Sequence, residues 1–272
     1  SPKARGTIYV GTDDANVQMT TDGGGHWTDL TSRFRLSEPR YVSKVLASRH
    51  DARVAYVAFD GHWDDDMHPY LFKTIDGGAT WSANALVYRA PAASTVCECC
   101  HPSAHFNTRG DLAVMWRNGV DGARDMWSTT RLAGTKAFSP ATKLGTGTWL
   151  LQACPMDGGS VFTSGDTFTT IWQRAGSVFL AQPGSPEIPL GPGTQPVAAT
   201  LGSATHIFFQ RGPDLIATRL SASVAPSPPA PHAQQARFPS LLALPDGRAI
   251  LLAYEQGPAK GAVSVVVETL AP

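Results

Sequence analysis

The chain has 272 residues, of which 42% are hydrophobic and only 16% are charged. Lys and Arg together number 22, and so do Asp and Glu, so the zero formal net charge argues against a nucleic-acid or membrane-surface protein. The 26 Gly and 21 Pro residues favour many short strands joined by tight turns. Closed β architectures reach this length as a single domain.

Neither end of the chain carries an obvious membrane signal. No apolar run approaches the roughly 18–20 residues that cross a bilayer. Residues 1–5 (SPKAR) lack the hydrophobic stretch of a signal peptide. We therefore expect either a cytoplasmic protein or the mature form of an exported one whose leader has been removed.

Strand-like runs recur along the whole chain, whereas helical periodicity is almost absent. The predicted strands fall into six groups: residues 7–12, 16–20 and 26–30; 42–47, 54–59, 70–73 and 81–87; 99–106, 112–116, 125–129 and 141–144; 150–154, 161–163, 167–173, 178–182 and 187–190; 195–201, 206–210 and 215–220; and 238–244, 249–254 and 263–269. The proline-rich residues 221–231 are predicted to form a stiff linker.

These groups predict an all-β protein, a single β-propeller of six blades with four antiparallel strands each. The blades are expected at about residues 1–31, 40–88, 95–145, 149–191, 194–221 and 235–272. The first and last groups each lack a strand, so strands from the two termini are expected to complete shared blades and close the ring. We interpret the chain as one domain, because seven blades or two domains would give blades that are too short.

One turn motif occurs twice, at residues 20–27 (TTDGGGHW) and 74–81 (TIDGGATW). Its glycines permit positive φ, its Asp can accept hydrogen bonds from the N–H groups of the turn, and its Trp is expected to bury its ring under the hairpin. Both copies resemble the Asp-box, or bacterial neuraminidase repeat (BNR), of sialidases and sortilin-like propellers. An Asp-box usually lies away from the active site, so the motif indicates fold strongly and function weakly.

The resemblance changes along the chain. Residues 6–81 resemble bacterial sortilin-like BNR propellers, notably at 48–52 (SRHDA), 56–62 (YVAFDGH) and 69–74 (PYLFKT). From Cys97 onward the chain resembles a group of bacterial sialidase-like proteins, at 97–100 (CECC), 154–159 (CPMDGG) and 237–242 (RFPSLL). Such a seam indicates either natural recombination or an engineered fusion of propeller fragments.

A short pattern recurs at the ends of predicted second strands: 116–119 (WRNG), 172–176 (WQRAG), 209–212 (FQRG) and 254–257 (YEQG). It is expected to aim Arg117, Arg174 and Arg211 at the pore face, joined by Arg124 and Arg237. Guanidinium forks bind carboxylates bidentately. Since sialidases hold their substrate's carboxylate with three arginines, the resemblance implies an anionic ligand or glycan at this face. The alternative is that these arginines cap carbonyls or pair with nearby carboxylates.

The resemblance also implies residues for catalysis. Tyr254 and Glu255 would be the nucleophile pair of a Tyr-based retaining glycosidase. Asp64, Asp65 or Asp66 in the loop at residues 62–68 (HWDDDMH) would supply the acid, and Asp65 is the residue we select. The chain departs from the sialidase pattern, because an Arg-Ile-Pro motif is missing near the N-terminus and residues 237–239 (RFP) are only a loose analogue. The 62–68 loop alternatively binds a hard cation or is simply solvated.

The four cysteines are the most specific signal. Cys97, Cys99 and Cys100, followed by His101, open the first strand of the third group, and Cys154 opens the first strand of the fourth. Adjacent first strands lie about 4.8 Å apart or somewhat wider, so Cys154 can meet one of the other three. The outcomes are one or two disulfides in an exported protein, a copper or zinc site that includes His101, or buried free thiols.

Three functional hypotheses follow. The first is a secreted or periplasmic sialidase-like propeller that binds a small anionic ligand or glycan, without nucleic-acid or membrane-spanning partners. If this protein is an enzyme, an exo-sialidase-like glycoside hydrolase is expected. The second is a copper- or zinc-binding protein that uses the cysteines. The third is a non-catalytic propeller scaffold, natural or engineered.

Overall fold

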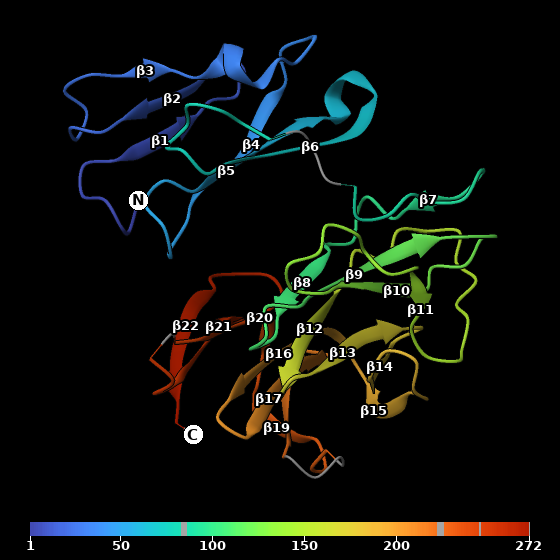
Figure 1. Ribbon diagram of the computed structural model, residues 1–272. Helices are drawn as coiled ribbons and strands as arrows, with labels where there is room; N and C mark the ends of the chain where they lie inside the picture. The colour runs from blue at the N-terminus through green and yellow to red at the C-terminus, as the bar shows by residue number, and fades with distance from the viewer. Residues whose placement is uncertain (83–85, 222–225, 245, 272) are drawn as a thin grey trace. The chain divides into compact units, whose positions relative to one another are not determined.

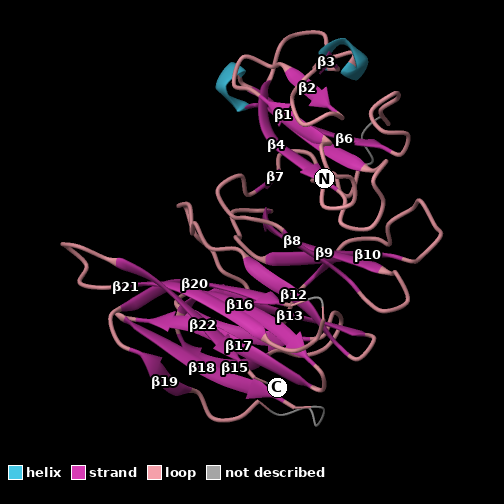
Figure 2. Ribbon diagram, turned by 90° about the vertical axis from the view of Figure 1, so that its left-hand side faces the viewer, coloured by secondary structure: helices cyan, strands magenta, loops and turns pink. Residues whose placement is uncertain are grey.

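The computed structural model describes residues 1–82, 86–221, 226–244 and 246–271. Two compact units make up the chain, Ser1–Leu86 and Val87–Pro272. The described residues form six antiparallel sheets, and their helical structure is limited to two short 3₁₀ turns, η1 (Thr31–Phe34) and η2 (His62–Asp64) (Figure 2). The predicted all-β class is confirmed. Within these ranges we find no helix with the length and hydropathy of a membrane span.

The first unit contains two sheets of three strands each. They comprise β1 (Ile8–Gly11), β2 (Val17–Thr20) and β3 (Thr28–Asp29), and then β4 (Tyr41–Ala47), β5 (Ala55–Gly61) and β6 (Asp66–Thr74) (Figure 1). Along β5 buried residues alternate with partly exposed ones, as expected where one face of a strand is packed. The core of this unit includes Val57, Phe59 and Phe72 from the second sheet and Phe34 from η1.

The second unit contains four sheets. Their strands are β7 (Thr95–Val96), β8 (Ser103–Phe106), β9 (Leu112–Gly119), β10 (Met126–Arg131) and β11 (Thr142–Lys143); β12 (Gly159–Ser164), β13 (Thr167–Arg174), β14 (Ser177–Ala181) and β15 (Ile188–Pro192); β16 (Thr194–Leu201), β17 (Ala204–Arg211), β18 (Asp214–Leu220) and β19 (Ala230–Ala233); and β20 (Ala236–Ala243), β21 (Ile250–Gln256) and β22 (Ser264–Leu270). The leading strands β8, β12, β16 and β20 contact one another in that order. Each sheet therefore packs its first strand beside that of the next.

Several predicted strands differ from the observed ones. Residues 150–154 form no strand, and Leu150 makes a single bridge to Ala123. The predicted linker at residues 221–231 instead leads into β19, in which Pro231 pairs with Ile216; residues 222–225 of this linker lie outside the described residues. Proline is compatible with β19 because an edge strand does not need every N–H for pairing. The predicted strand at 81–87 includes residues 83–85, which also lie outside the described residues.

The described sheets contain three, four or five strands rather than a uniform four. The boundary between the two compact units, Leu86 to Val87, falls in the stretch between residues 81 and 97 where the family resemblance changes. A single domain, and closure of the ring by strands from both termini, stay predictions.

Both turn motifs form the self-bonded turn that the sequence predicts. In the second motif, Thr74 Oγ1 donates to Asp76 Oδ1 at 2.7 Å and accepts the Gly78 N–H at 2.9 Å. The Asp76 carboxylate then accepts the N–H of Thr80 at 2.9 Å. Residues 20–26 repeat the arrangement, with His26 in place of Thr80. The chain reversal is thus fixed by side chains that lie within six residues of one another.

The two motif tryptophans have different surroundings. The Trp81 ring packs 4.7 Å from the Phe34 ring and joins the core of the first unit. Trp27 keeps 46% of its surface exposed, so the predicted burial of its ring is wrong. The reason is that Phe34, Phe59 and Phe72 fill the interior of this unit, and only Trp81 reaches it.

Candidate functional site

The cysteine cluster forms where the first strands of two neighbouring sheets meet. Cys97 directly follows β7, and its N–H donates to the carbonyl of Arg117 in β9 at 2.8 Å. Residues 97–100 then form a tight turn, the cysteine turn, in which the Cys100 N–H donates to the Cys97 carbonyl at 3.4 Å. Strand β8 begins after this turn. Cys154 lies in the loop that precedes β12, and β8 contacts β12. The fold therefore brings together cysteines that are 55 residues apart in the sequence.

All four sulfur atoms belong to one cluster. Cys99 and Cys154 form a disulfide, with their Cα atoms 6.4 Å apart. Cys97 Sγ lies 3.4 Å from Cys99 Sγ and 3.5 Å from Cys100 Sγ, and the Cys99 and Cys100 sulfurs are 3.9 Å apart. The prediction that Cys154 meets one of the other three cysteines is confirmed. The observed state is one disulfide beside two free thiols.

The four sulfurs differ in their exposure to solvent. Cys97 and Cys100 are 3% and 4% exposed, Cys99 is half-buried, and Cys154 is exposed. Burial raises the pKa of the Cys97 thiol, and its contact with Cys100 adds to the effect. Solvent therefore reaches the cluster from the Cys154 side.

His101 lies beside the sulfur cluster rather than within it. Its ring packs against Gly158, where a Cβ would lie 2.6 Å from His101 Nε2. The ring acts electrostatically on the buried carboxyl of Asp157. Among the described residues, Cys97, Cys99 and Cys154 make up the one group of at least three His, Cys, Asp or Glu side chains that converge closely enough to hold a metal ion. A ligand role for His101 stays a prediction.

Arg117 is a fully buried cation that binds backbone carbonyls. It is 1% exposed; it donates to the Asp157 carbonyl from Nε at 3.2 Å and from Nη2 at 2.9 Å, to the Gln173 carbonyl at 2.9 Å and to the Arg124 carbonyl at 2.6 Å. The guanidinium also lies 5.4 Å from the centre of the Trp149 ring. Of the two predicted roles, this geometry matches carbonyl capping.

Asp157 is the buried carboxylate next to this arginine. Its Oδ2 accepts the N–H of Gln195 at 2.9 Å, whereas Oδ1 has no hydrogen-bond partner among the described residues. Burial raises the pKa of this carboxyl, although the Gln195 N–H and the charge of Arg117 act in the opposite direction. The carboxyl therefore ties the loop before β12 to the start of β16.

Arg174, Arg211 and Arg237 also have partners in the described part of the chain. Arg174 forms a two-pronged ion pair with Glu187, 2.8 Å from Nη1 to Oε2, and lies 4.2 Å from the centre of the Phe179 ring. Arg211 donates to the Pro192 carbonyl at 3.1 Å.

Arg237 pairs with Glu255 at 3.2 Å, which leaves Arg124 as the remaining member of the predicted ligand-binding set. In the described part of the chain its side chain has neither a hydrogen bond nor an ion pair. Its charge acts on the thiol of Cys97.

Tyr254 and Glu255 face different partners. The Tyr254 hydroxyl donates to Glu268, whose second oxygen lies 2.9 Å from His232 Nε2. Burial and Glu268 raise the pKa of Tyr254 to about 12. Successive side chains of a strand point to opposite faces. Glu255, which follows Tyr254 on β21, therefore has a different partner and forms an ion pair with Arg237. Our sequence analysis missed Glu268, although the two-residue periodicity of β22 was an available signal.

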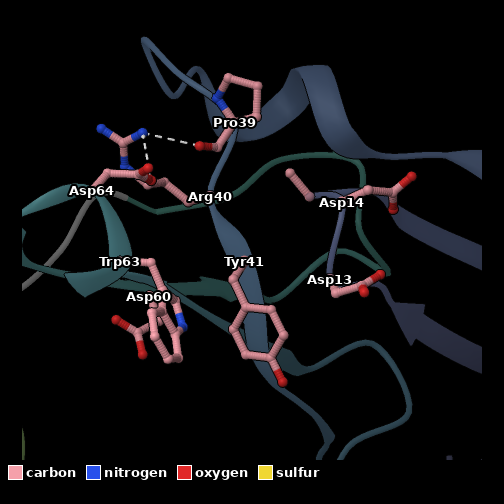
Figure 3. A pocket seen from close by; sticks show the side chains of 9 residues that line it. Asp13, Asp14, Pro39, Arg40, Tyr41, Asp60, Trp63 and Asp64 are labelled. Atoms are coloured by element: carbon pink, nitrogen blue, oxygen red, sulfur yellow. Dashed lines mark hydrogen bonds and ion pairs between the residues drawn. The ribbon is translucent and has the colours of Figure 1, made fainter.

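The predicted acid, Asp65, lies in the first unit, where it ends η2 with a φ of 56°. Nearby, a cavity of about 270 Å³ is lined by residues that include Asp13, Tyr41, Trp63 and Asp64 (Figure 3). Trp63 is 78% exposed there. Roles for Asp65, Tyr254 and Glu255 in catalysis stay predictions.

The carboxylates of the 62–68 loop and its surroundings are largely paired. Asp60 Oδ2 lies 2.6 Å from His62 Nδ1. Asp66 accepts the Tyr70 hydroxyl at 2.6 Å and pairs with Arg40 at 3.1 Å. Bonding of this kind stabilises the loop itself. The described side chains therefore give no support to the hard-cation alternative.

Comparison with solved structures found similar chains of low sequence identity. A structure from a study of two prolyl endopeptidases is 13% identical in sequence, with a TM-score of 0.53. The match covers 98% of this chain and 40% of the endopeptidase chain. A YCF48 structure with bound D1 peptide is 14% identical over 97% of this chain and 74% of its own, with a TM-score of 0.45. A GH74 xyloglucanase from Xanthomonas campestris is 16% identical over 92% of this chain and 41% of its own, with a TM-score of 0.42.

The likeness to the prolyl endopeptidase structure, with its TM-score of 0.53, supports a β-propeller fold and does not establish an activity. The chain spans 40% of the length of the prolyl endopeptidase and 41% of that of the xyloglucanase. No protein-family model matches the sequence, and the search of curated proteins found no match. The sialidase and sortilin-like character thus stays a resemblance.

Proposed function

We propose that this β-propeller protein, in its reduced form, binds one soft metal ion, copper(I) or zinc(II), through Cys97, Cys99, Cys100 and Cys154. The observation that carries the proposal is the set of sulfur–sulfur distances, 3.4, 3.5 and 3.9 Å within the cysteine turn. Zinc–sulfur bonds of about 2.3 Å in a tetrahedron require sulfurs about 3.8 Å apart. The turn therefore holds three sulfurs close to the spacing of a metal site.

The chemistry of the cluster favours a soft ion. Thiolates select copper(I) and zinc over harder cations, and the cluster contains only sulfur donors. Four thiolates leave a negative charge on either complex, and the guanidinium of Arg124, which acts on Cys97, supplies part of the countercharge. The hydrogen bond from the Cys97 N–H to Arg117 ties the turn to β9.

The disulfide bears on the cellular location. Disulfides persist in oxidising compartments and are rare where glutathione keeps thiols reduced. The Cys99–Cys154 pair therefore supports a secreted or periplasmic location, which we include in the proposal.

Metal analysis of reduced protein tests the proposal. Protein reduced with a phosphine and desalted without oxygen is incubated with zinc(II) or copper(I), and the retained metal is measured by mass spectrometry. We expect about one ion per chain for the wild type and loss of that ion in Cys97→Ser. His101→Ala tests the ligand role predicted for His101: a site made of the four sulfurs alone retains the ion in this variant, whereas loss of the ion would add His101 to the ligands. No retained metal in the reduced wild type, or undiminished binding by Cys97→Ser, would overturn the proposal.

A glycan-binding function is the second candidate that the sequence suggests, and Arg124 is the observation that bears on it. Its guanidinium is not committed to another described side chain, whereas Arg117, Arg174, Arg211 and Arg237 are engaged. Turnover of a fluorogenic sialoside that is lost in Tyr254→Phe would support a sialidase-like hydrolase. No turnover across a panel of glycosides would rule the hydrolase out.

A further inference from the structure

We infer that the Cys99–Cys154 disulfide is a redox gate on the cysteine cluster, opened by a thiol that attacks the exposed Cys154. Opening the disulfide completes the set of four thiolates, and closing it withdraws two of them and releases the metal. This inference rests on the proposed metal-binding function and concerns its regulation.

The exposure of the four sulfurs sets the direction of attack. Thiol–disulfide exchange requires a thiolate to reach one sulfur of the bond. Cys154 is exposed, Cys99 is half-buried, and the thiols of Cys97 and Cys100 are almost completely buried. An external thiol therefore meets Cys154 Sγ first, and Cys99 is the leaving group.

The released Cys99 thiolate stays among potential ligands. Its sulfur lies 3.4 Å from Cys97 Sγ and 3.9 Å from Cys100 Sγ. Cys97, Cys99 and Cys154 offer sulfurs that all lie within 4.8 Å of one another. Cleavage of one covalent bond thus converts a disulfide flanked by two thiols into four thiols: Cys97, Cys99 and Cys154 lie within 4.8 Å of one another, and Cys100 lies 3.5 Å from Cys97.

The opening step needs an external dithiol, either a small molecule or a protein. One thiolate of the dithiol attacks Cys154 Sγ, the S–S bond breaks, and Cys99 leaves as a thiolate. The second thiol of the reductant then attacks the mixed disulfide and releases the Cys154 thiolate. The reductant becomes a disulfide, and the protein gains two electrons.

Closing is the reverse two-electron step, with a disulfide-containing oxidant as the electron acceptor. Cys99 and Cys154 join, which leaves Cys97 and Cys100, whose sulfurs are 3.5 Å apart, as the remaining thiols. Outer-shell substitutions at metal sites already cost about 10–100-fold in affinity, so withdrawing two direct ligands should weaken binding by roughly 100-fold or more. Metal release accompanies oxidation.

Competition with a chromophoric chelator tests the gate. Zinc affinity is measured for wild-type protein in the oxidised form and after reduction and removal of the reductant. We expect binding at least roughly 100-fold weaker in the oxidised form. Cys154→Ser cannot form the disulfide and has lost one ligand, so its zinc binding should be weaker than that of the reduced wild type and should be the same with and without prior reduction.

Trapping of the mixed disulfide tests the point of attack. Oxidised protein is treated with a monothiol, quenched with an alkylating agent and mapped by peptide mass spectrometry. Attachment to Cys154 is expected, and attachment to Cys99 would contradict the inference.

The outcomes separate the gate from the metal site itself. Equal zinc affinity in both redox states of the wild type would refute the gate and leave the metal site standing. Absence of binding in the reduced wild type would refute the proposed function and the gate with it. The comparison of the two wild-type forms does not depend on how well a variant folds.

Discussion

Replacing Arg117 with methionine tests whether this arginine is structural. The side chain donates four hydrogen bonds to three carbonyls, the buried ones of Asp157 and Gln173 and the partly buried one of Arg124. Leaving a buried polar group without its partner costs about 1–3 kcal/mol, so losing the cap on three carbonyls should lower the free energy of unfolding by about 4 kcal/mol after partial access of water. Methionine retains most of the side-chain volume, so the loss reports mainly on hydrogen bonding.

The assay is urea denaturation followed by tryptophan fluorescence, with Trp149 beneath the Arg117 guanidinium as a local reporter. Arg124→Met is the matched control, because its side chain has no hydrogen bond or ion pair with the described residues; a change within about 0.5 kcal/mol is expected there. If Arg117→Met unfolds within about 1 kcal/mol of this control, the capping role is refuted and a ligand-binding role for Arg117 gains support.

Three further predictions concern other parts of the molecule. Trp81→Ala should destabilise the first unit by about 3 kcal/mol and Trp27→Ala by less than about 1 kcal/mol, measured by thermal unfolding; equal losses would contradict the observed difference in burial. Hydrogen bonds lower the pKa of Asp76 to about 2. The stability that this carboxylate provides is therefore present above its unfolded pKa of about 4 and is lost as pH falls from about 4 to about 2. Asp76→Asn should reduce the loss of folding stability between these pH values, and an unchanged stability profile would argue against this. The pKa of Tyr254 is raised to about 12. The stability linked to this shift is present below the unfolded pKa of about 10 and is lost as pH rises from about 10 to about 12. Tyr254→Phe should remove this loss of stability, followed by circular dichroism, and an equal loss in the variant would show that it has another origin.

Much of the fold follows from local patterns. The two-residue alternation of Ala55–Gly61 and the turn residues around Asp76 identify strands and reversals without knowledge of distant contacts. Local patterns did not predict the strands β7, which has two residues, and β19, which contains a proline. Such strands exist because a neighbouring strand provides the pairing, and that information is tertiary.

The candidate site was only partly predictable. The order of the strands was sufficient to bring Cys154 to the cysteine turn, but it gave no basis for choosing Cys99 as its partner. The recurring arginine pattern predicted a cationic face, yet the carbonyls that surround Arg117 and the carboxylate of Glu187 beside Arg174 belong to segments distant in the sequence. A pattern can indicate a charged side chain without indicating what satisfies it.

The sequence alone determined an all-β chain of short strands, two Asp-anchored turns and the approach of Cys154 to residues 97–100, because each depends on alternation, turn chemistry or strand order. The tertiary structure decided which sulfurs are bonded, which are exposed and which arginines are already engaged. These depend on how the first strands of successive sheets pack, and a shift of a few ångströms there changes which donor and acceptor meet.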